Sequence, residues 1–570
     1  MAVCSLRKIA ASLVALLPLL ANSQIIPITL RESPSYNHDF EFPLPIMPVK
    51  QPLTTYTNPK TGVQVDFYEI KIKETTKNLF PDLGDATLIG YDGQIPGPTF
   101  RVPKGRETVI RFVNEYYRRS AIHLHGSYSR APFDGWAEDT ILPGQYKDYY
   151  YPNTQSARTL WYHDHAMGIT ALNAYSGQAG FYILEDAALE ASLDLPRGSY
   201  DIPLMLNSKR YTSTGNITNE SAETISTYGD TPSVNGQILP HFVVEPRKYR
   251  FRVLNAAASR TFNLTLNVDA TRENKKFHVV GSDAGFMSKS VETESLVVAM
   301  AERWEIVIDF ANLAGQNLTL KQSNCFIDTN YVGYDKVMQF RVGNAVTSEV
   351  GNGPLPDKLV DLDLPAPKTQ LDQNFVFGRV RGDWTINSVT FSNVKNRILR
   401  NVPRGTTEMW RLQGGGGWSH PVHIHLVDLQ ILSRRKATQN SAFGRTEVTP
   451  YEAAALKDVI VLGNNEAVTV LAKYAPWDGV YMFHCHNLVH EDHDMMGAFN
   501  VTALSDFNYP ETTRFIDPME PRFRAKPYNG FTVAEANSAL EFFSSLNAYT
   551  DADGIENALD QYWAKKASAP

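Results

Sequence analysis

One short segment near the C-terminus combines side chains that bind redox metals. Residues 484–495 read His-Cys-His-Asn-Leu-Val-His-Glu-Asp-His-Asp-Met. Two imidazoles, one thiolate and a weak axial thioether form the ligand set of electron-transfer copper, because soft sulfur and imidazole suit copper in both oxidation states. Cys485, His490 and Met495 supply three of these four ligands. The segment therefore predicts a copper site that a histidine from elsewhere in the chain completes.

Three clusters upstream each contain a His-x-His pair. They are His123-Leu124-His125, His163-Asp164-His165 and His420-Pro421-Val422-His423-Ile424-His425. Residues i and i+2 of a β-strand point to the same face, so each pair directs two imidazoles towards one point. A buried imidazole also needs a partner for its second nitrogen, which makes such clusters costly without a metal. The pattern predicts several metal ions bound where these strands converge.

The four motifs resemble the copper signatures of the multicopper oxidases. Within that family the chain is most similar to fungal bilirubin oxidases, through residues 90–93, 133–139, 155–160 and 490–496. The resemblance covers roughly residues 40–530. It implies an enzyme with four copper ions that takes single electrons from an organic donor and reduces dioxygen to water.

The resemblance also implies a role for each metal ligand. The type 1 copper, where electrons from the donor arrive, would be held by His420, Cys485, His490 and Met495. The type 2 copper would be held by His123 and His423, and the paired type 3 coppers by His125, His163, His165, His425, His484 and His486. Alternation along a strand should point Cys485 to one face and its two histidine neighbours to the other. One strand should therefore touch both copper sites.

Two carboxylates and one indole extend the predicted site. Asp134 and Glu491 match acidic positions that the family uses to deliver the protons that dioxygen reduction consumes. The alternatives are that Asp134 caps a turn before Gly135 and that Glu491 is a solvated charge. Trp418 matches a tryptophan beside the type 1 site of bilirubin oxidases, and its alternative is ordinary packing between domains.

The donor is less closely defined by the sequence. A methionine at the axial position favours a moderate type 1 potential and thus easily oxidised donors, such as tetrapyrroles including bilirubin, phenols and aminophenols. The alternative enzymes are a laccase-like oxidase of phenols or pigment precursors and a metal-ion oxidase. The latter would require a carboxylate-rich or methionine-rich patch near His490, and no methionine-rich insertion occurs. A copper-storage protein, the non-enzyme alternative, has no use for a thiolate between His484 and His486.

The elements that position these motifs recur along the chain. A turn followed by a β-rich run occurs at 93–100, at 235–240 and at 386–389, about every 150 residues. That period is domain-sized and too long for a solenoid. Alternating runs such as 249–254 and 468–472 predict half-buried strands. The fold class is predicted to be all-β, and the resemblance implies three cupredoxin-like Greek-key β-sandwich domains.

We predict domains at residues 50–190, 191–350 and 351–506. The middle domain carries Ala256-Ala257-Ala258 where a histidine pair would fall, so it is predicted to hold no copper ligand. A three-copper site would then lie between the first and third domains. The extension 507–570 is predicted to contain a short helix over 533–546, because apolar residues recur there at intervals of three or four. We expect this helix to pack on the third domain, and the alternative is that it binds a partner protein.

The N-terminus and the composition point to export. Residues 1–23 combine a basic start, an apolar core too short to span a bilayer and a C-terminal cleavage region of small residues, as in a signal peptide. Residues 24–49 form an N-terminal segment that is predicted to be partly processed. Removal of Arg7 and Lys8 moves the formal charge from -7 to -9, which leaves no basic patch for nucleic acid. Cys325, the cysteine left after Cys4 is removed and Cys485 binds copper, is predicted to be a buried apolar residue, with pairing to another molecule as the alternative.

We therefore predict a secreted, glycosylated monomer without a membrane anchor. Its predicted partners are dioxygen and a small organic electron donor. Five Asn-x-Ser/Thr sequons are compatible with glycosylation: Asn216, Asn219, Asn263, Asn317 and Asn500.

Overall fold

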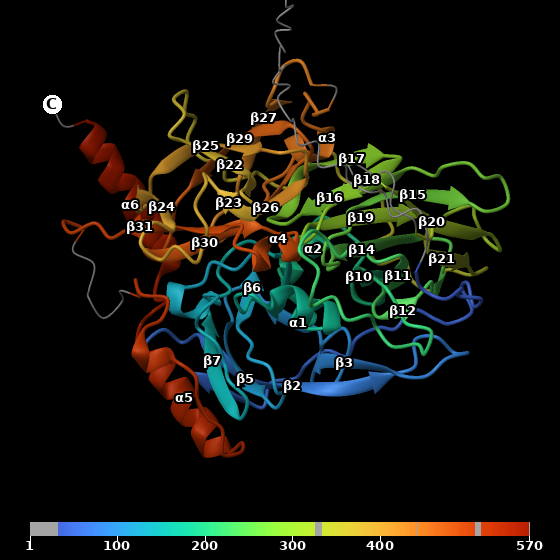
Figure 1. Ribbon diagram of the computed structural model, residues 1–570, viewed down its shortest axis with the longest axis horizontal. Coiled ribbons are helices and arrows are strands. Elements are labelled where there is room, and N and C mark those ends of the chain that lie inside the picture. The colour runs from blue at the N-terminus through green and yellow to red at the C-terminus, as the bar shows by residue number, and fades with distance from the viewer. Residues whose placement is uncertain (1–31, 325–332, 442, 508–514, 569–570) are drawn as a thin grey trace, which may run out of the picture.

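The computed structural model describes residues 32–324, 333–441, 443–507 and 515–568. The predicted signal peptide and Cys325 lie outside these ranges. The described residues form three pairs of β-sheets, built from three successive parts of the chain except for a strand at residues 526–527, which joins the first pair. Figure 1 shows the first part in blue and cyan, the middle part in green and the third part in yellow and orange. We call these sheet pairs the first, middle and third domains.

The first domain pairs a six-stranded sheet, β1-β2-β5-β7-β32 with β3 also bound to β2, with a four-stranded sheet, β4-β9-β8-β6. Its strands are β1 (Thr54–Thr57), β2 (Gln64–Lys77), β3 (Ala86–Tyr91), β4 (Phe100–Pro103), β5 (Glu107–Asn114), β6 (Ile122–His125), β7 (Gln145–Tyr151), β8 (Arg158–Asp164), β9 (Ala179–Glu185) and β32 (Lys526–Pro527). Two short helices accompany them, α1 (Thr170–Ser176) and α2 (Ala187–Ser192).

The middle domain pairs a seven-stranded sheet, β12-β11-β10-β14-β19-β16-β17, with a five-stranded sheet, β13-β21-β20-β15-β18. Its strands are β10 (Asp201–Lys209), β11 (Thr231–Val234), β12 (Gln237–Ile238), β13 (His241–Val244), β14 (Lys248–Asn255), β15 (Phe262–Val268), β16 (Phe277–Ser282), β17 (Gly285–Thr293), β18 (Ser295–Val298), β19 (Arg303–Asp309), β20 (Asn317–Ser323) and β21 (Lys336–Val342).

The third domain pairs two five-stranded sheets, β23-β22-β25-β29-β27 and β24-β31-β30-β26-β28. Its strands are β22 (Gln373–Val380), β23 (Asp383–Ile386), β24 (Ile398–Pro403), β25 (Thr407–Gly414), β26 (His420–Ile424), β27 (Gln430–Lys436), β28 (Val459–Leu462), β29 (Glu466–Lys473), β30 (Gly479–Cys485) and β31 (Met496–Thr502). The helices α3 (Pro450–Ala453) and α4 (Leu488–Asp492) lie in its loops. The prediction of an all-β fold with a short helical extension is confirmed.

The repeated turn has the same structure in all three domains. Asp92, Asn235 and Asn387 each have positive φ, as does the residue that follows each of them. Two positive φ angles in succession are typical of type I′ hairpin turns, which asparagine and aspartate tolerate. The side chain at each first position also accepts a backbone N–H from a neighbouring strand, at 2.9, 2.8 and 2.7 Å respectively. The sequence repeat is thus a structural repeat.

The first and third domains share a hydrophobic core. One continuous cluster of buried apolar residues runs through both domains and into the C-terminal extension, while the middle domain has a cluster of its own. Burial of apolar surface is non-directional but scales with area, so this shared core holds the two domains firmly together. Strands of the two domains that carry histidines are therefore fixed relative to each other.

The alternating run on β14 is buried on both faces. Phe251 and Val253 pack into the core of the middle domain, as predicted. The arginines between them were expected at the solvent, yet Arg250 and Arg252 are 0% and 1% exposed. Both pair with Asp201, at 3.0 and 2.8 Å. The prediction that this strand is half-buried was therefore wrong. The buried Asp201 carboxylate pairs with both arginines and so takes the place of the water that a charged side chain usually needs.

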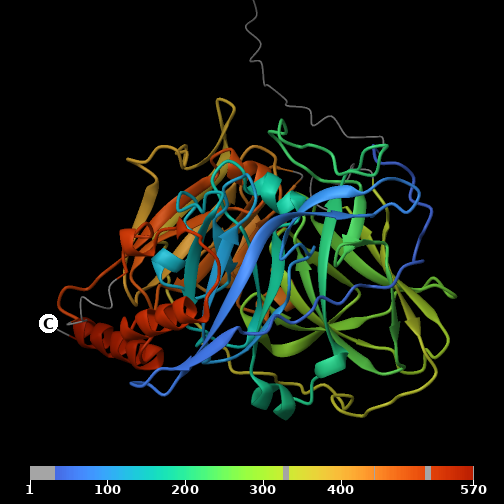
Figure 2. The same cartoon turned by 90° about the horizontal axis from the view of Figure 1, so that it is seen from below.

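The C-terminal extension contacts two domains. The predicted helix is α5 (Val533–Ser545), but its buried face packs on β1 and β2 of the first domain and not on the third domain. β32 also joins the first domain, through β7. A second helix, α6 (Ala552–Ala567), lies against the third domain, where the Trp563 indole donates to the Arg404 carbonyl at 2.8 Å. Figure 2 shows both helices, in red, at one end of the molecule.

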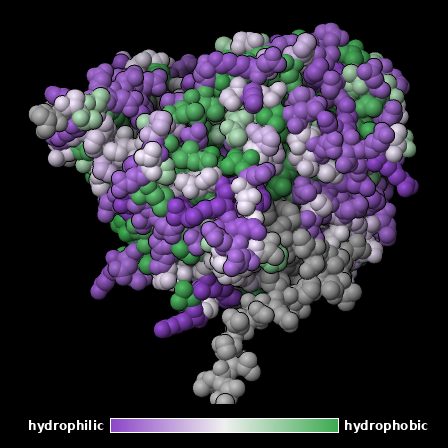
Figure 3. All heavy atoms as spheres, turned by 90° about the horizontal axis from the view of Figure 1, so that it is seen from above, coloured by the Kyte–Doolittle hydropathy of each residue, from purple (hydrophilic) through white to green (hydrophobic). Residues whose placement is uncertain are grey.

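The outer surface is mixed in polarity. On the face drawn in Figure 3, hydrophobic residues form separate small groups among hydrophilic ones. Among the described residues, no helix is long and apolar enough to cross a membrane.

Candidate metal centres

The sulfur-containing group lies inside the third domain. Cys485 at the end of β30 has its Sγ 3.4 Å from His420 Nδ1 on β26 and 3.6 Å from His490 Nδ1 on α4. The two imidazole nitrogens are 3.2 Å apart, and all three side chains are at most 1% exposed. Met495 is fully buried, and its backbone closes the loop by accepting the Cys485 N–H at 3.1 Å. Strands β26 and β30 and one tight loop thus bring these four residues together.

The remaining eight predicted ligands form a second cluster at the domain interface. They come from β6 and β8 of the first domain and from β26 and β30 of the third, including the residue just after each of β8, β26 and β30. His123 is the cross-strand partner of His163, and His423 is the partner of His484. Three compact groups result: His123 with His125 and His423; His125 with His163 and His486; and His165 with His425 and His484.

Alternation along β30 separates the two centres as predicted. Cys485 faces His420 and His490, while His484 and His486 face the eight-histidine cluster. Successive side chains of a strand point to opposite faces, so a single residue step joins the two centres. The chain therefore offers a covalent connection between them through the backbone of β30.

Carbonyl and carboxylate oxygens fix the direction of most imidazoles. The Nδ1 atoms of His123, His163 and His423 donate to backbone carbonyls at 2.6, 2.8 and 2.9 Å. A carbonyl can only accept, so each Nδ1 carries the proton and each Nε2 keeps its lone pair. His125 is reversed, since its Nε2 faces the Asp458 carboxylate at 3.2 Å and its Nδ1 has no partner.

The cluster has the properties of a set of metal ligands. Burial lowers the pKa of seven of these histidines, to about 3 for His163 and about 4 for His165. Neutral imidazoles then face each other with lone pairs, as at His123 Nε2 and His423 Nε2, which are 3.3 Å apart. Two nitrogens that share a metal ion at about 2.0 Å stand roughly 3.3 Å apart. The donor set and its spacing therefore fit metal ions.

The thiol at position 485 also requires a metal to ionise. Burial raises the pKa of Cys485 well above that of an exposed thiol. A coordinating metal removes the proton of such a thiol outright. The Asn487 backbone N–H points at the same sulfur, at 3.4 Å, and favours its anionic form.

Both predicted carboxylates reach the histidine cluster. Asp134 Oδ2 accepts the His425 Nδ1 proton at 2.7 Å, and its carbonyl holds His123. Burial raises the pKa of Asp134 well above that of a solvated carboxyl group. Glu491 lies 3.0 Å from His484 Nδ1 and 3.6 Å from His165 Nδ1. Neither is a solvated charge, because the Asp134 and Glu491 side chains are 4% and 1% exposed.

Two tryptophans line the sulfur-containing group. Trp418 is 7% exposed, with its ring centroid 6.0 Å from that of His490. Trp384, fully buried on β23, stacks on His490 at 3.7 Å and contacts Trp418 at 5.5 Å. Trp384 could not be identified from the sequence, since no spacing to a histidine motif marks it. Asp458 could not be identified either, because its only signal is an acid directly before the apolar strand β28.

Comparisons with known proteins agree with this geometry. Family models described as multicopper oxidase match residues 73–188, 200–333 and 364–505. The chain is 50% identical to a bilirubin oxidase of Albifimbria verrucaria, over 91% of this chain and 92% of that protein. It is 32% identical to a laccase of Bacillus subtilis, over 76% and 94% of the two chains. The solved McoA multicopper oxidase of Aquifex aeolicus covers 83% of this chain with all of its own, at a TM-score of 0.69 and 25% identity.

These similarities run along all three domains and include the strands that carry the histidine and cysteine motifs. The protein is a copper-binding oxidoreductase with oxygen as acceptor. The chain belongs to the multicopper oxidase family.

Proposed function

We propose that the chain is a secreted, monomeric oxidase of small organic donors, with tetrapyrroles such as bilirubin and with phenols and aminophenols as its donor classes. Of the domains at 50–190, 191–350 and 351–506, the first and third provide twelve ligands for four copper ions, and the middle one provides none. When bound, copper supplies the redox chemistry that takes single electrons from a donor and reduces dioxygen to water. The observation that carries the proposal is the step along β30 from the Cys485 group to the eight-histidine cluster.

The ligand roles are those that the family resemblance implies, and the spacing of the groups supports them. The type 1 ligands are His420, Cys485, His490 and Met495. His123 and His423, whose Nε2 atoms are 3.3 Å apart, are the type 2 ligands. The type 3 ligands form two triads, one of His125, His163 and His486 and one of His165, His425 and His484.

Asp134 and Glu491 relay protons for the reduction of dioxygen. Each carboxylate contacts histidines of the cluster from outside it, so each can exchange a proton without occupying a ligand position. The raised pKa of Asp134 lets it keep a proton at a pH where a solvated carboxyl group is ionised. This role differs from that of a turn cap, which would leave the carboxylate at the surface.

Trp418 and Trp384 form the aromatic wall on the donor side. Trp418 is the more exposed of the two, and the pair covers the imidazole of His490. An organic donor with a conjugated ring can meet this wall at the exposed edge of Trp418, since aromatic pairs favour centroid distances of about 4.5–7 Å. The similarity to a bilirubin oxidase supports tetrapyrroles as donors, and the similarity to laccases supports phenols.

A metal-ion donor has less support from the contacts. A cavity of about 110 Å³ beside α4 is lined by Glu220, Glu223 and Asp492. Asp492 accepts the N–H groups of Thr170 and Ala171 at 2.9 and 2.8 Å. Glu220 pairs with a nearby arginine, and Glu223 accepts N–H groups of its own loop. The three carboxylates are thus committed to structural contacts.

A donor panel tests the proposal. We expect the purified copper-loaded protein to oxidise bilirubin and dimethoxyphenol with kcat/KM at least about tenfold above that for ferrous ion, a difference of about 1.4 kcal/mol. Oxygen uptake and donor absorbance give the measurement. A higher kcat/KM for ferrous ion would show that the donor is a metal ion and not an organic molecule. It would not affect the assignment of the copper ligands.

A further inference from the structure

Arg303 of the middle domain reaches the histidine cluster through one carboxylate. We infer that Arg303 is a positioning residue for the predicted type 2 and type 3 ligands, acting through Asp458, so that the middle domain helps to hold the three-copper site. The inference rests on the proposed function. It assigns a role at the site to a domain that contributes no ligand.

Asp458 contacts two predicted ligands at once. Its side chain accepts from His125 Nε2 at 3.2 Å, and its backbone carbonyl accepts from His423 Nδ1 at 2.9 Å. These contacts set which nitrogen of each ring faces the cluster. The orientation of both imidazoles therefore depends on where Asp458 is held.

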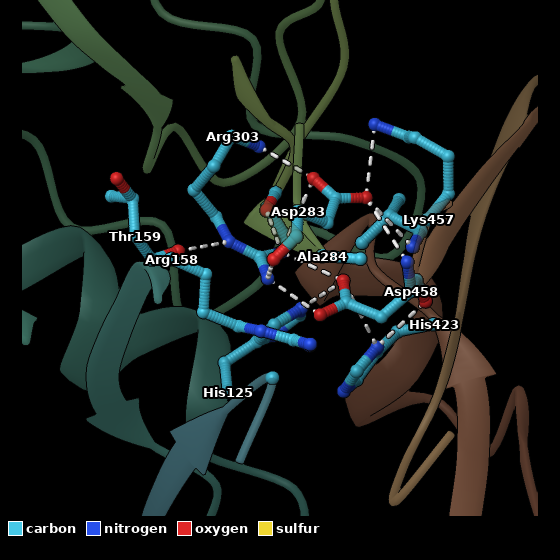
Figure 4. A network of polar contacts seen from close by, with 12 residues as sticks. His125, Arg158, Thr159, Asp283, Ala284, Arg303, His423, Lys457 and Asp458 are labelled. Carbon is cyan, nitrogen blue, oxygen red and sulfur yellow. Dashed lines mark hydrogen bonds and ion pairs between the residues drawn. The ribbon is translucent and has the colours of Figure 1, made fainter. Parts of the chain in front are cut away.

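Arg303 holds Asp458 with a fork of two N–H groups. Its Nη1 and Nη2 donate to the two carboxylate oxygens at 2.7 and 2.5 Å. Its Nε donates to the Thr159 carbonyl of the first domain at 2.9 Å. The other two N–H groups donate to the carbonyls of Ala301 and Asp283, at 3.0 and 3.1 Å. All five donors are used, and one buried side chain bridges all three domains (Figure 4).

The backbone around Asp458 is held from the same side. Asp283 of the middle domain accepts the N–H groups of Asp458 and Val459, both at 3.1 Å. Lys457 adds an ion pair to Asp283 at 2.9 Å. Figure 4 shows Asp283, Arg303 and Lys457 on one side of Asp458, with His125 and His423 on the other. The middle domain thus fixes both the side chain and the main chain of this residue.

The first histidine motif leaves room for this ion pair. A Cβ atom at Gly126, directly after His125, would lie 2.6 Å from Arg303 Nη2 and 2.8 Å from Asp458 Oδ2. Gly126 also has a φ of 88°, which other residues rarely adopt. The glycine of the His-Leu-His-Gly motif therefore lets the guanidinium and the carboxylate meet directly behind a predicted ligand.

The role of Arg303 depends on the planar guanidinium, which can bind both oxygens of a carboxylate at once. A lysine keeps the charge but is a point donor that cannot hold both oxygens of a carboxylate in one plane. Asp458 would then rotate, and His125 would lose the partner that directs its Nδ1 to the cluster. Partners of metal ligands typically change metal affinity by about 10- to 100-fold when they are altered.

The test uses the full-length copper-loaded protein with Arg303→Lys and Asp458→Asn. Arg252→Lys is the matched control, because Arg252 is equally buried on a neighbouring strand and binds Asp201, Glu305 and Thr159 but no predicted ligand. The readouts are copper per chain, the electron paramagnetic resonance spectrum of type 2 copper, the blue absorption of type 1 copper, and the thermal unfolding midpoint of the copper-free protein.

We expect both site variants to keep the blue absorption and to bind type 2 copper about tenfold or more weakly, with a changed resonance spectrum. Arg252→Lys should lower the unfolding midpoint without changing that spectrum. Asp458→Asn, which preserves size, decides the question if Arg303→Lys does not fold. The inference is overturned if both site variants match wild type, or if all three variants lose copper in proportion to their unfolding midpoints. A wild-type protein without type 2 copper would contradict the proposed function instead.

Discussion

Cys485→Ser should yield a colourless protein whose donor oxidation is at least about 1000-fold slower, a loss of roughly 4 kcal/mol in the barrier term. The sulfur is fully buried and faces two imidazole nitrogens at 3.4 and 3.6 Å. Serine keeps the size but replaces a soft ligand by a hard oxygen, which does not suit copper in both oxidation states. Visible absorption and steady-state oxygen uptake give the measurement.

Cys325→Ser is the matched control for that change. It makes the same substitution at a cysteine outside the twelve predicted ligands, and it should keep both colour and turnover. The copper that remains in Cys485→Ser, measured per chain, should be that of the eight-histidine cluster. A blue and active Cys485→Ser protein would show that the sulfur is not a ligand.

Asp134→Asn should slow the reduction of dioxygen about 100-fold, the lower range for loss of a positioned acid or base. The asparagine amide oxygen can still accept the His425 Nδ1 proton, which Asp134 accepts at 2.7 Å, so the imidazole should stay in place. The amide cannot exchange a proton near neutral pH. Donor oxidation should change by less than about twofold, because Asp134 does not touch the Cys485 group.

Separate half-reactions distinguish these effects. Loss of blue colour under anaerobic donor reports reduction, and its return on mixing with oxygen reports the second half-reaction. Asp139→Asn is the control, since Asp139 is a buried acid five residues on that pairs with Arg524 at 2.7 Å and contacts no predicted ligand. Equal loss in both half-reactions of Asp134→Asn would indicate a structural role and not proton delivery.

Residues whose function depends on local spacing could be predicted from the sequence. The His-x-His pairs and the segment around Cys485 follow the two-residue period of a strand, so the faces of β26 and β30 followed directly. The turn repeat at Asp92, Asn235 and Asn387 likewise depends on local backbone preferences. These local features sufficed for the fold class and for the faces of the histidine strands, whereas the residues that meet at each centre were implied by the family resemblance.

Features that depend on packing between distant segments could not be predicted. Apolar spacing showed that α5 has a buried face, but not that this face packs on β1 and β2. Trp384 and His490 are separated by 106 positions, and their stacking arises only from the way β23 meets α4. Arg250 and Arg252 look solvent-exposed in sequence because Asp201, their buried partner, lies on another strand.

Copper content tests the central claim most directly. After reconstitution with cuprous ion and removal of unbound metal, elemental analysis of the folded protein should give four copper ions per chain, one of them blue. That result is expected because eleven of the twelve predicted ligands form one sulfur-containing group and three histidine groups, and the twelfth, Met495, is buried beside Cys485. A folded, reconstituted protein that binds one copper ion or none would contradict the account.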